Sequence, residues 1–268
     1  MMRTNILITR TLITMEGCNM TYQKKLEEAA RLIQTHQKVY ALTGAGISTE
    51  SGLPDFRSPG TGLWTKVDPT KYSTAQVLYE NPDKFFRFGF ERFYSLRKVE
   101  PNRGHFALAW MEKERLLQGV ITQNIDGLHY KAGSEKVWEV HGHLRTGYCI
   151  DCTKEVLFEE LMTQHEQNVI PPKCTCGGML RPSVVLFGDS LGDAFAKAEQ
   201  TLSWGCDLML VVGSSLTVYP VASLPSWASR LILINLQPTP FDNDADVLIQ
   251  DESGKALEDL VEQLKLIN

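Results

Sequence analysis

Twenty residues, Val39 to Ser58, constrain the fold of this 268-residue chain more than any other stretch. They begin with a short apolar run that is typical of a buried strand, and the run ends in Gly44-Ala45-Gly46. Glycines after a strand let the backbone approach a ligand closely, and free N–H groups at the start of a helix favour a phosphate. The pattern therefore predicts a dinucleotide site at the end of a strand.

The same stretch departs from the usual dinucleotide fingerprint. The third glycine is due at Thr49, and Pro54 both removes an N–H donor and disfavours helix at the residue before it. The helix after the glycines must therefore be short. We expect Asp55-Phe56-Arg57, which places a carboxylate, an aromatic ring and a guanidinium in a row, to fold over the ligand as a loop.

Four later apolar runs also end in glycine or polar side chains. Because ligands bind outside the carboxyl ends of the strands in an open parallel sheet, we expect these groups to share one edge. The runs and their ends are 118–122 with Gln123 to His129, 137–140 with His141, 208–212 with Gly213-Ser214-Ser215, and 231–234 with Asn235. Helical patterns at 22–36, 105–117, 193–204 and 254–264 complete an α/β fold with a doubly wound, parallel, Rossmann-like sheet.

Between Arg145 and Arg181 this alternation stops. Cys149-x-x-Cys152, 21 further residues and then Cys174-x-Cys176 have the spacing of a zinc ribbon, although the second pair is one residue tighter than usual. Four thiolates leave no open coordination position, so we expect one structural zinc ion. The alternatives are reduced core cysteines or a ribbon that binds nucleic acid, and few basic residues surround the segment.

These patterns divide the chain into parts. We expect a Rossmann-like domain, a helical cover whose aromatic residues form a small core, a zinc-ribbon module, and an N-terminal extension in which Met15 and Met20 are alternative starts and no secretory signal is recognised. Their ranges are 21–58, 102–144 and 182–268 for the domain, 59–101 for the cover, 145–181 for the ribbon and 1–20 for the extension.

Bulk properties restrict the function. The net charge of −5 and the pI of about 5.7 argue against a protein that follows nucleic-acid phosphates. No apolar run approaches the roughly 20 residues of a membrane span. The clustered cysteines indicate metal binding rather than a disulfide framework, and so a reducing, cytoplasmic setting.

One histidine stands out by its position. His141 ends a predicted strand at the same edge as the glycine loop, and imidazole titrates near working pH, so we expect a general base. A lone histidine is more often structural. We expect His129 to support the neighbouring Asn-Ile-Asp cluster, His105 to pack, and His36 and His165 to lie at the surface.

From Tyr22 to Leu264 the motifs and their order resemble those of the sirtuin (Sir2) family of NAD-dependent protein deacylases, with bacterial and archaeal members nearest. The resemblance rests on Gly44-Ala45-Gly46-Ile47-Ser48, Ser51 to Arg57, Thr122 to His129, Val140-His141-Gly142, the four cysteines, Arg181 to Asp189, and Gly213 to Leu216. It implies NAD as co-substrate, acyl-lysine proteins as substrates, and nicotinamide, O-acyl-ADP-ribose and free lysine as products.

The resemblance also implies roles for single residues. The acyl oxygen would attack the ribose as nicotinamide leaves, and His141 would then deprotonate a ribose hydroxyl that attacks the resulting imidate. Val185, Phe187 and Gly188 would form the edge that pairs with the substrate backbone. The implied NAD contacts are Gly44, Ala45, Gly46, Thr49, Asp55, Phe56 and Arg57 in the first loop, Gln123, Asn124, Ile125 and Asp126 around nicotinamide and its ribose, and Gly213, Ser214, Ser215 and Asn235 on the phosphate and adenosine side.

Two departures bear on specificity. Relatives that prefer acidic acyl groups carry a Tyr-x-x-Arg pair, and the matching positions here are Gly89 and Arg92, so we expect simple apolar acyl groups such as acetyl. Asp189 replaces a commoner glutamate, which we expect to be a mild change.

Three rival functions remain at this stage. ADP-ribosyl transfer to protein uses the same NAD cleavage, but it needs no base at His141. A non-catalytic NAD-responsive protein would not need the catalytic positions that are present here. A zinc-ribbon DNA module disagrees with the acidic pI.

Overall fold

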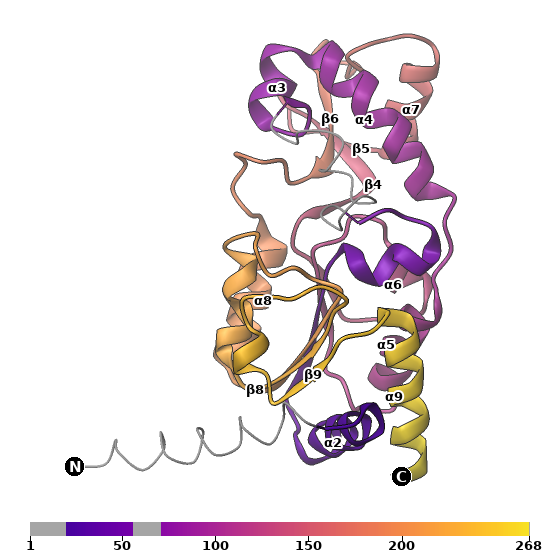
Figure 1. Ribbon diagram of the computed structural model, residues 1–268. Coiled ribbons are helices and arrows are strands. Elements are labelled where there is room, and N and C mark those ends of the chain that lie inside the picture. Colours follow the sequence, from indigo (N-terminus) through magenta and orange to yellow (C-terminus); the bar gives the residue numbers. More distant parts are fainter. Residues whose placement is uncertain (1–19, 56–70, 268) are drawn as a thin grey trace, which may run out of the picture.

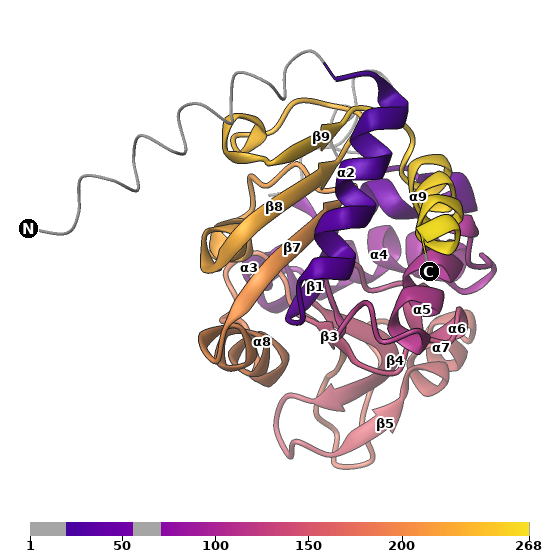
Figure 2. The same cartoon turned by 90° about the horizontal axis from the view of Figure 1, so that it is seen from below.

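The computed structural model describes residues 20–55 and 71–267, and its larger sheet has six parallel strands in the order β3-β2-β1-β7-β8-β9 (Figures 1 and 2). The strand order reverses direction between β1 and β7, so the sheet is doubly wound as the sequence predicts. The strands are β1 (Val39–Thr43), β2 (Val120–Thr122), β3 (Val137–Glu139), β7 (Cys206–Val212), β8 (Ala228–Ile234) and β9 (Val247–Ile249).

The central strands form because almost every side chain is apolar and both faces of the sheet are covered. All five residues of β1 are buried, and β7 is buried except at Asp207. Parallel pairing places Thr43 beside both Thr122 and Val212. The strands therefore end level with one another, and the residues that follow them meet at one edge.

Three helices cover one face of this sheet: α2 (Tyr22–Thr35), α5 (Arg103–Lys113) and α9 (Ser253–Ile267). In α2 the buried positions Leu26, Ala29, Ala30, Leu32 and Ile33 form one apolar stripe, which shares a core with α5, α9 and the strands. The side chain of Thr21 accepts a hydrogen bond from the N–H of Lys24 and starts α2.

Helix α8 (Asp193–Ser203) and the short helix η5 (Val221–Trp227) cover the opposite face. Figure 1 shows α8 on one side of the sheet and α5 and α9 on the other. The short helices η2 (Ala45–Ser51), α6 (Leu128–Lys131) and η6 (Asp242–Asp244) lie in loops of this layer structure. Gly52, in the left-handed conformation at φ +87°, ends η2 two residues before Pro54, so the helix after the glycine loop is short as predicted.

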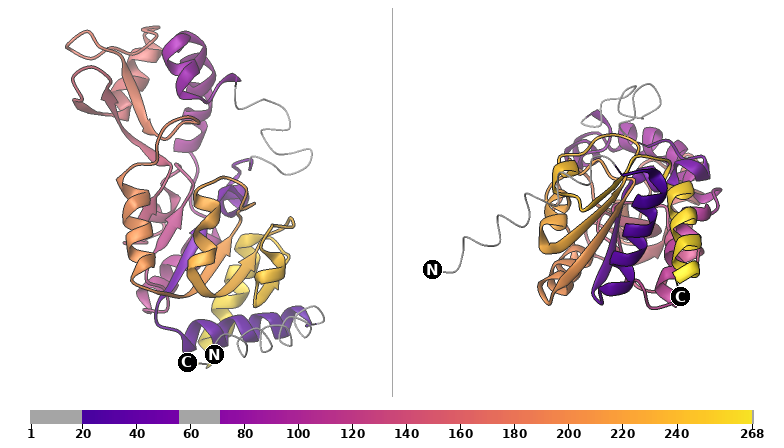
Figure 3. Two further views of the ribbon diagram at one scale, coloured as in Figure 1. Left: turned by 90° about the vertical axis from the view of Figure 1, so that its left-hand side faces the viewer. Right: turned by 60° about the horizontal axis from the view of Figure 1, so that its bottom comes forward.

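A second, three-stranded antiparallel sheet lies beyond the carboxyl ends of the first (Figures 1 and 3). It consists of β4 (Gly142–Cys149), β5 (Glu155–Leu157) and β6 (Leu180–Val184). It shares one core with α3 (Ala75–Glu80), α4 (Pro82–Arg97) and α7 (Phe158–Glu166), in which Phe90 stacks on Phe158. The aromatic stretch before residue 101 therefore does form a helical core.

The predicted helices and strands all occur, with ends shifted by a few residues. Strand β9, which is three residues long, is not predicted from the sequence, and neither are β4, β5, β6 and α7. The expected bounds place residues 142–144 and 182–184 in the larger domain, whereas these residues lie in β4 and β6, which pair with each other in the smaller sheet. No helix in the described part of the chain has the length and apolar character needed to cross a membrane.

The turn into β4 yields a stability prediction. Gly142 has φ +79°, and a Cβ there would lie 2.1 Å from the carbonyl oxygen of Ser183, whereas Gly133 has φ +100° and open space around it. Gly133→Ala should cost about 1 to 2 kcal/mol for the left-handed backbone alone. Gly142→Ala should lower the free energy of unfolding by at least about 2 kcal/mol more than Gly133→Ala does, because its Cβ also clashes with Ser183. Equal losses in denaturant unfolding would contradict the close approach at Gly142.

Candidate active site

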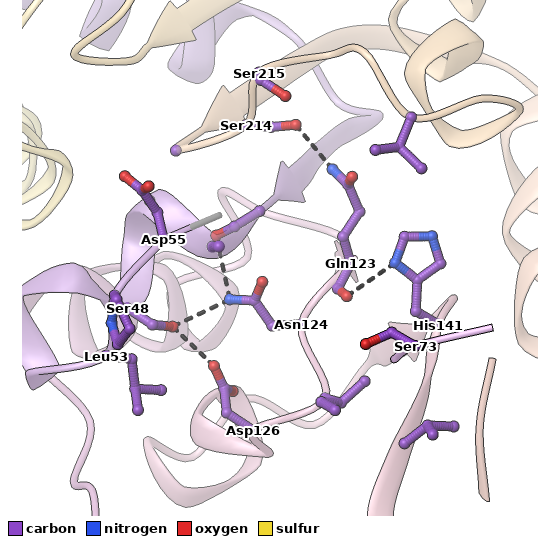
Figure 4. A pocket seen from close by; sticks show the side chains of 18 of the residues that line it. Ser48, Leu53, Asp55, Ser73, Gln123, Asn124, Asp126, His141, Ser214 and Ser215 are labelled. Atoms are coloured by element: carbon purple, nitrogen blue, oxygen red, sulfur yellow. Dashed lines mark hydrogen bonds between the residues drawn. The ribbon is translucent and has the colours of Figure 1, made fainter. Parts of the chain in front are cut away.

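The described residues line a cleft of about 1280 Å³ between the two sheets. It lies outside the carboxyl ends of β1, β2, β7 and β8, at the point where the strand order reverses, which is where doubly wound sheets bind ligands. Figure 4 shows the side chains that face it. Of the predicted NAD contacts, Phe56 and Arg57 lie outside the described residues, and all the others line the cleft.

The glycine loop after β1 rests directly on the loop after β7. The N–H of Gly46 donates to the carbonyl of Gly213 at 2.8 Å, and the N–H of Gly44 donates to that of Val212 at 3.1 Å. A Cβ on Gly46 would lie 2.7 Å from the Cα of Gly213, and a Cβ on Gly213 would lie 2.3 Å from the nitrogen of Ile47. Only glycines permit this approach, and the neighbouring residues Ala45, Thr49, Ser214 and Ser215 line the same cleft.

An amide and a carboxylate are held together below this loop (Figure 4). The side-chain amide of Asn124 donates to the carbonyl of Gly44 and to the hydroxyl of Ser48, each at 3.1 Å. Ser48 donates in turn to a carboxylate oxygen of Asp126 at 2.8 Å. Burial raises the pKa of Asp126, and hydrogen bonds from Leu128 and Ser48 oppose that shift. Asn124 and Asp126 therefore form a fixed polar corner of the cleft.

His141 follows β3 and immediately precedes β4, so it lies where the chain passes from the larger sheet to the smaller. Its Nδ1 is 3.0 Å from the carbonyl oxygen of Gln123. A carbonyl can only accept, so Nδ1 carries the proton and the lone pair lies on Nε2. Burial lowers the pKa of His141, and the hydrogen bond to Gln123 opposes this shift. The ring is a neutral base in the same cleft as Ala45 and Asn124.

Gln123 links the base to the rest of the edge. Its backbone holds His141, and its side-chain amide donates to the hydroxyl of Ser214 at 2.8 Å. On the far side of β7, Asn235 donates to the carbonyl of Gln237 at 2.6 Å and marks the end of β8. The ends of β2, β7 and β8 thus contribute to one continuous surface, as the strand pattern predicts.

The predicted substrate edge differs in one respect from expectation. Val185, Phe187 and Gly188 line the cleft, and the N–H of Val185 donates to the carbonyl of His141 at 2.8 Å. However, the N–H of Phe187 donates to Ser73 and its carbonyl accepts from Ala75. The backbone N–H and carbonyl of Phe187 are therefore already paired with Ser73 and with the first residue of α3, although the residue lines the cleft and is 43% exposed.

Helix α4 contributes lining residues that the aromatic pattern alone did not separate from core. Phe85 and Phe86 are buried, but Phe85 lines the cleft together with Phe88, which stacks on Tyr72 with 4.2 Å between the ring centroids. Gly89 and Arg92 line it too, and burial lowers the pKa of Arg92 to about 10. An arginine on an otherwise apolar helical face was the available signal. The loop residues Val218, Tyr219, Pro220, Leu236 and Glu252 were also not predicted.

Two other histidines are buried behind Ser48. The rings of His105 and His129 are 5.0 Å apart, and His129 Nε2 is 2.9 Å from the hydroxyl of Thr43. Burial lowers the pKa of His105 to about 4 and that of His129 well below its usual value. His105 packs as predicted. His165 was predicted at the surface, but it is half-buried, with its ring 4.3 Å from that of Phe90.

The four predicted metal ligands converge at the far end of the smaller sheet. Their sulfur atoms all lie within 4.8 Å of one another, with Cys149 and Cys176 at 3.5 Å and Cys152 and Cys174 at 3.8 Å. A tetrahedral zinc with Zn–S bonds of about 2.3 Å requires sulfurs about 3.8 Å apart. A Cβ on Gly178 would lie 2.7 Å from the sulfur of Cys149. The donor set and its spacing fit a structural zinc ion.

Comparison with known proteins extends over both sheets. The sequence model of the Sir2 family matches residues 44–220. A protein of Caldanaerobacter subterraneus subsp. tengcongensis named NAD-dependent protein deacetylase 2 is 51% identical over 240 residues, which cover 89% of this chain and 96% of that protein.

Solved structures agree in fold. A structure of Sir2 with a p53 peptide and NAD⁺ has a TM-score of 0.81 and 36% identity, covering 89% of this chain and 98% of that chain. One of Sir2 with deacetylated p53 peptide and 3′-O-acetyl ADP ribose has a TM-score of 0.83 and 37% identity, covering 88% and 97%.

The buried histidines predict acid sensitivity. An imidazole with a pKa of about 4 when folded and 6.5 when unfolded contributes its full stability above pH 6.5 and loses it as the pH falls toward 4. For His105 this amounts to about 2 kcal/mol between pH 7 and pH 5. In thermal unfolding, His105→Asn should show a smaller acid-induced drop in Tm than the wild type. His36→Asn, at the end of α2, should keep the wild-type drop, and an unchanged drop in both variants would contradict this account.

The cysteine cluster predicts one zinc per chain. Atomic absorption should detect it, and a chelator should lower the Tm, because metal binding there contributes folding free energy. Cys149→Ser should abolish stoichiometric zinc. Cys206→Ser is the matched control, since Cys206 is a buried thiol of β7 whose pKa burial raises to about 12. Full zinc content in Cys149→Ser, or a loss in both variants, would contradict the site.

Proposed function

Because this chain belongs to the Sir2 family, we propose that the cleft between its sheets binds NAD and an acyl-lysine peptide side by side. The protein is an NAD-dependent protein-lysine deacylase. It transfers the acyl group of a lysine side chain to the ADP-ribose part of NAD, and it releases nicotinamide, O-acyl-ADP-ribose and free lysine. Peptide and NAD⁺ in a solved Sir2 structure support this pairing of substrates.

One observation carries the proposal: the imidazole of His141 faces the cleft with a fixed tautomer. The carbonyl of Gln123 holds the proton on Nδ1, so Nε2 accepts the next one. The same Gln123 reaches Ser214 through its side chain, which ties the base to the glycine loops. A ligand seated on those loops lies within the same cleft as the base.

In the reaction, the acyl oxygen of the lysine amide attacks the ribose carbon as the C–N bond to nicotinamide breaks. Positive charge develops on the ribose during this step, and the carboxylate of Asp126 and the amide of Asn124 lie at the corner where they can stabilise it. His141 Nε2 then takes the proton of a ribose hydroxyl, whose oxygen attacks the carbon of the imidate. Water finally releases the lysine amine.

The individual contacts belong to this proposal. Asn124, Ile125 and Asp126 hold nicotinamide, and Gln123 holds its ribose. The phosphates and adenosine lie along both glycine loops, and Phe56 and Arg57 stay predictions beyond the described residues. The remaining proposed NAD contacts are Gly44, Ala45, Gly46, Thr49 and Asp55, together with Gly213, Ser214, Ser215 and Asn235.

Specificity and setting complete the proposal. Acetyl is the preferred acyl group, supported by Gly89 where relatives that prefer acidic groups carry tyrosine, and by the deacetylase name of the relative from Caldanaerobacter. The protein acts in the cytoplasm, where its thiolate cluster stays reduced. A net charge of −5 supports protein rather than nucleic-acid partners.

The division of the chain is a proposal as well. Ranges 21–58, 102–144 and 182–268 make the NAD-binding domain, 59–101 the helical module and 145–181 the zinc module. The three residues 182–184 connect the domain to the smaller sheet through β6.

The central experiment incubates the protein with an acetylated peptide, with and without NAD, and follows nicotinamide and peptide mass. Nicotinamide release should depend on the peptide, and the peptide should lose the mass of one acetyl group. His141→Ala should lower the deacetylation rate by at least about 100-fold, because a general base contributes that much. His143→Ala is the matched control, because this residue lines a different surface hollow and should keep nearly full activity.

Two results would contradict the proposal. Labelled ADP-ribose that stays attached to protein, with the acetyl group retained, would favour the transferase. Full deacetylation by His141→Ala would remove this residue from the reaction.

A further inference from the structure

Arg181, in β6, is a charged residue buried beneath the edge of the cleft, with only 3% of its side chain exposed. One guanidinium nitrogen, Nη2, donates to the Asp189 carboxylate at 2.6 Å and to the carbonyl of Val184 at 3.1 Å. The other, Nη1, donates to the hydroxyl of Tyr79 in α3 at 3.3 Å. Arg181 therefore joins β6, the segment that follows it, and the helical module.

The carboxylate of Asp189 closes a turn. The oxygen that pairs with Arg181 also accepts the N–H of Leu186 at 2.9 Å, and the N–H of Asp189 donates back to the carbonyl of Leu186 at 3.0 Å. Gly188 lies inside this turn at φ +92°. The position of one carboxylate thus sets the path of residues 186–189, and Arg181 holds that carboxylate.

This turn belongs to the wall of the cleft. Every residue from Val184 to Asp189 lines it, and the N–H of Val185 donates to the carbonyl of His141. The N–H of Phe187 donates to the carbonyl of Ser73, and its carbonyl accepts the N–H of Ala75 at the start of α3. The wall segment is consequently fixed near the base at its start and by Arg181 at its end.

Stability alone gives little reason for this arrangement. Taking a guanidinium and a carboxylate out of water costs free energy that their attraction often fails to recover. The Nε of Arg181 is buried and has no hydrogen-bond partner among the described residues, which adds to the cost. A buried pair of this kind is better explained by the conformation that it specifies.

We propose that Arg181 is a positioning residue for acyl-peptide binding: through Asp189 it holds residues 184–189 in the conformation that receives the peptide. The inference rests on the proposed function. Arg181 itself would not contact NAD, because its hydrogen-bond partners are Tyr79 in α3 and two residues of the wall segment 184–189.

Arg230 and Asp246 supply a matched control. Arg230 donates to Asp246 at 2.6 Å, and the other carboxylate oxygen of Asp246 accepts the N–H of Leu231 at 2.8 Å, so this pair also joins an arginine to a backbone N–H through one aspartate, but its arginine is 41% exposed. Arg230 lies near the start of β8, at the opposite end of that strand from the cleft. Any effect of losing an Arg–Asp pair as such should appear in Arg230→Gln as well.

The test measures the Kd of a fluorescent acetyl-lysine peptide and the Kd of NAD for the wild type, Arg181→Gln, Asp189→Asn, their double variant and Arg230→Gln. We expect the peptide Kd to rise at least about 10-fold in both single variants at the cleft, because misplacement by about 1 Å is that costly. The NAD Kd should change less than about 2-fold. The double variant should bind the peptide no more weakly than the weaker-binding single variant does, since both residues act through one hydrogen-bond network.

Three outcomes would overturn the inference: an unchanged peptide Kd, an equal loss of NAD affinity, or losses that add in the double variant. If Arg181→Gln fails to fold, the peptide Kd values of Asp189→Asn and Arg181→Lys test the inference instead. Arg181→Lys keeps the positive charge but has one nitrogen where the guanidinium uses two to reach Tyr79, Val184 and Asp189. The deacetylation rate of the wild type distinguishes a failure of the proposed function from a failure of the role proposed for Arg181. A wild type that binds acetyl-peptide without deacetylating it sinks the proposed function, whereas an active wild type with unaffected variants sinks only the role of Arg181.

Discussion

The contact between two glycine loops is the constraint on which the rest of the site depends. Gly44 and Gly46 after β1 lie against Gly213 after β7, with backbone atoms at distances that exclude any side chain. The contact joins the two halves of the sheet at the point where the strand order reverses. It places glycine backbone and the small hydroxyl side chains of Thr49, Ser214 and Ser215 along the cleft, which allows a diphosphate to approach closely.

The second element of the site is the passage of the chain from one sheet to the other. His141 occupies that passage, and its neighbours Glu139 and Arg145 form an ion pair across it, with the guanidinium of Arg145 over the ring of Tyr130. The zinc centre is built from the turns around β4 and β6 and lies far from the reacting groups. Two of its cysteines, Cys149 and Cys174, belong to the apolar core that the smaller sheet shares with α3, α4 and α7, so the metal would brace the edge of that core.

The sequence predicted the larger sheet well because each strand is a continuous apolar run with a distinctive polar end. Strand β9 is not predicted, since a run of three apolar residues is too short to carry a periodic signal. β6 was missed because its sequence, with Arg181 and Pro182, is atypical of a strand, and pairing with β4 determines it. The backbone pairing of Phe187 is not predictable locally because its partners, Ser73 and Ala75, lie more than 100 residues earlier. Long-range pairing of this kind leaves no local mark.

The two hydrogen bonds of His141 point to different parts of the molecule. Its ring is held by Gln123 at the end of β2, whereas its own carbonyl holds Val185 at the start of the peptide wall. One residue therefore links the strand end that carries Gln123 to the start of the peptide wall, so a displacement of that wall would be transmitted to His141.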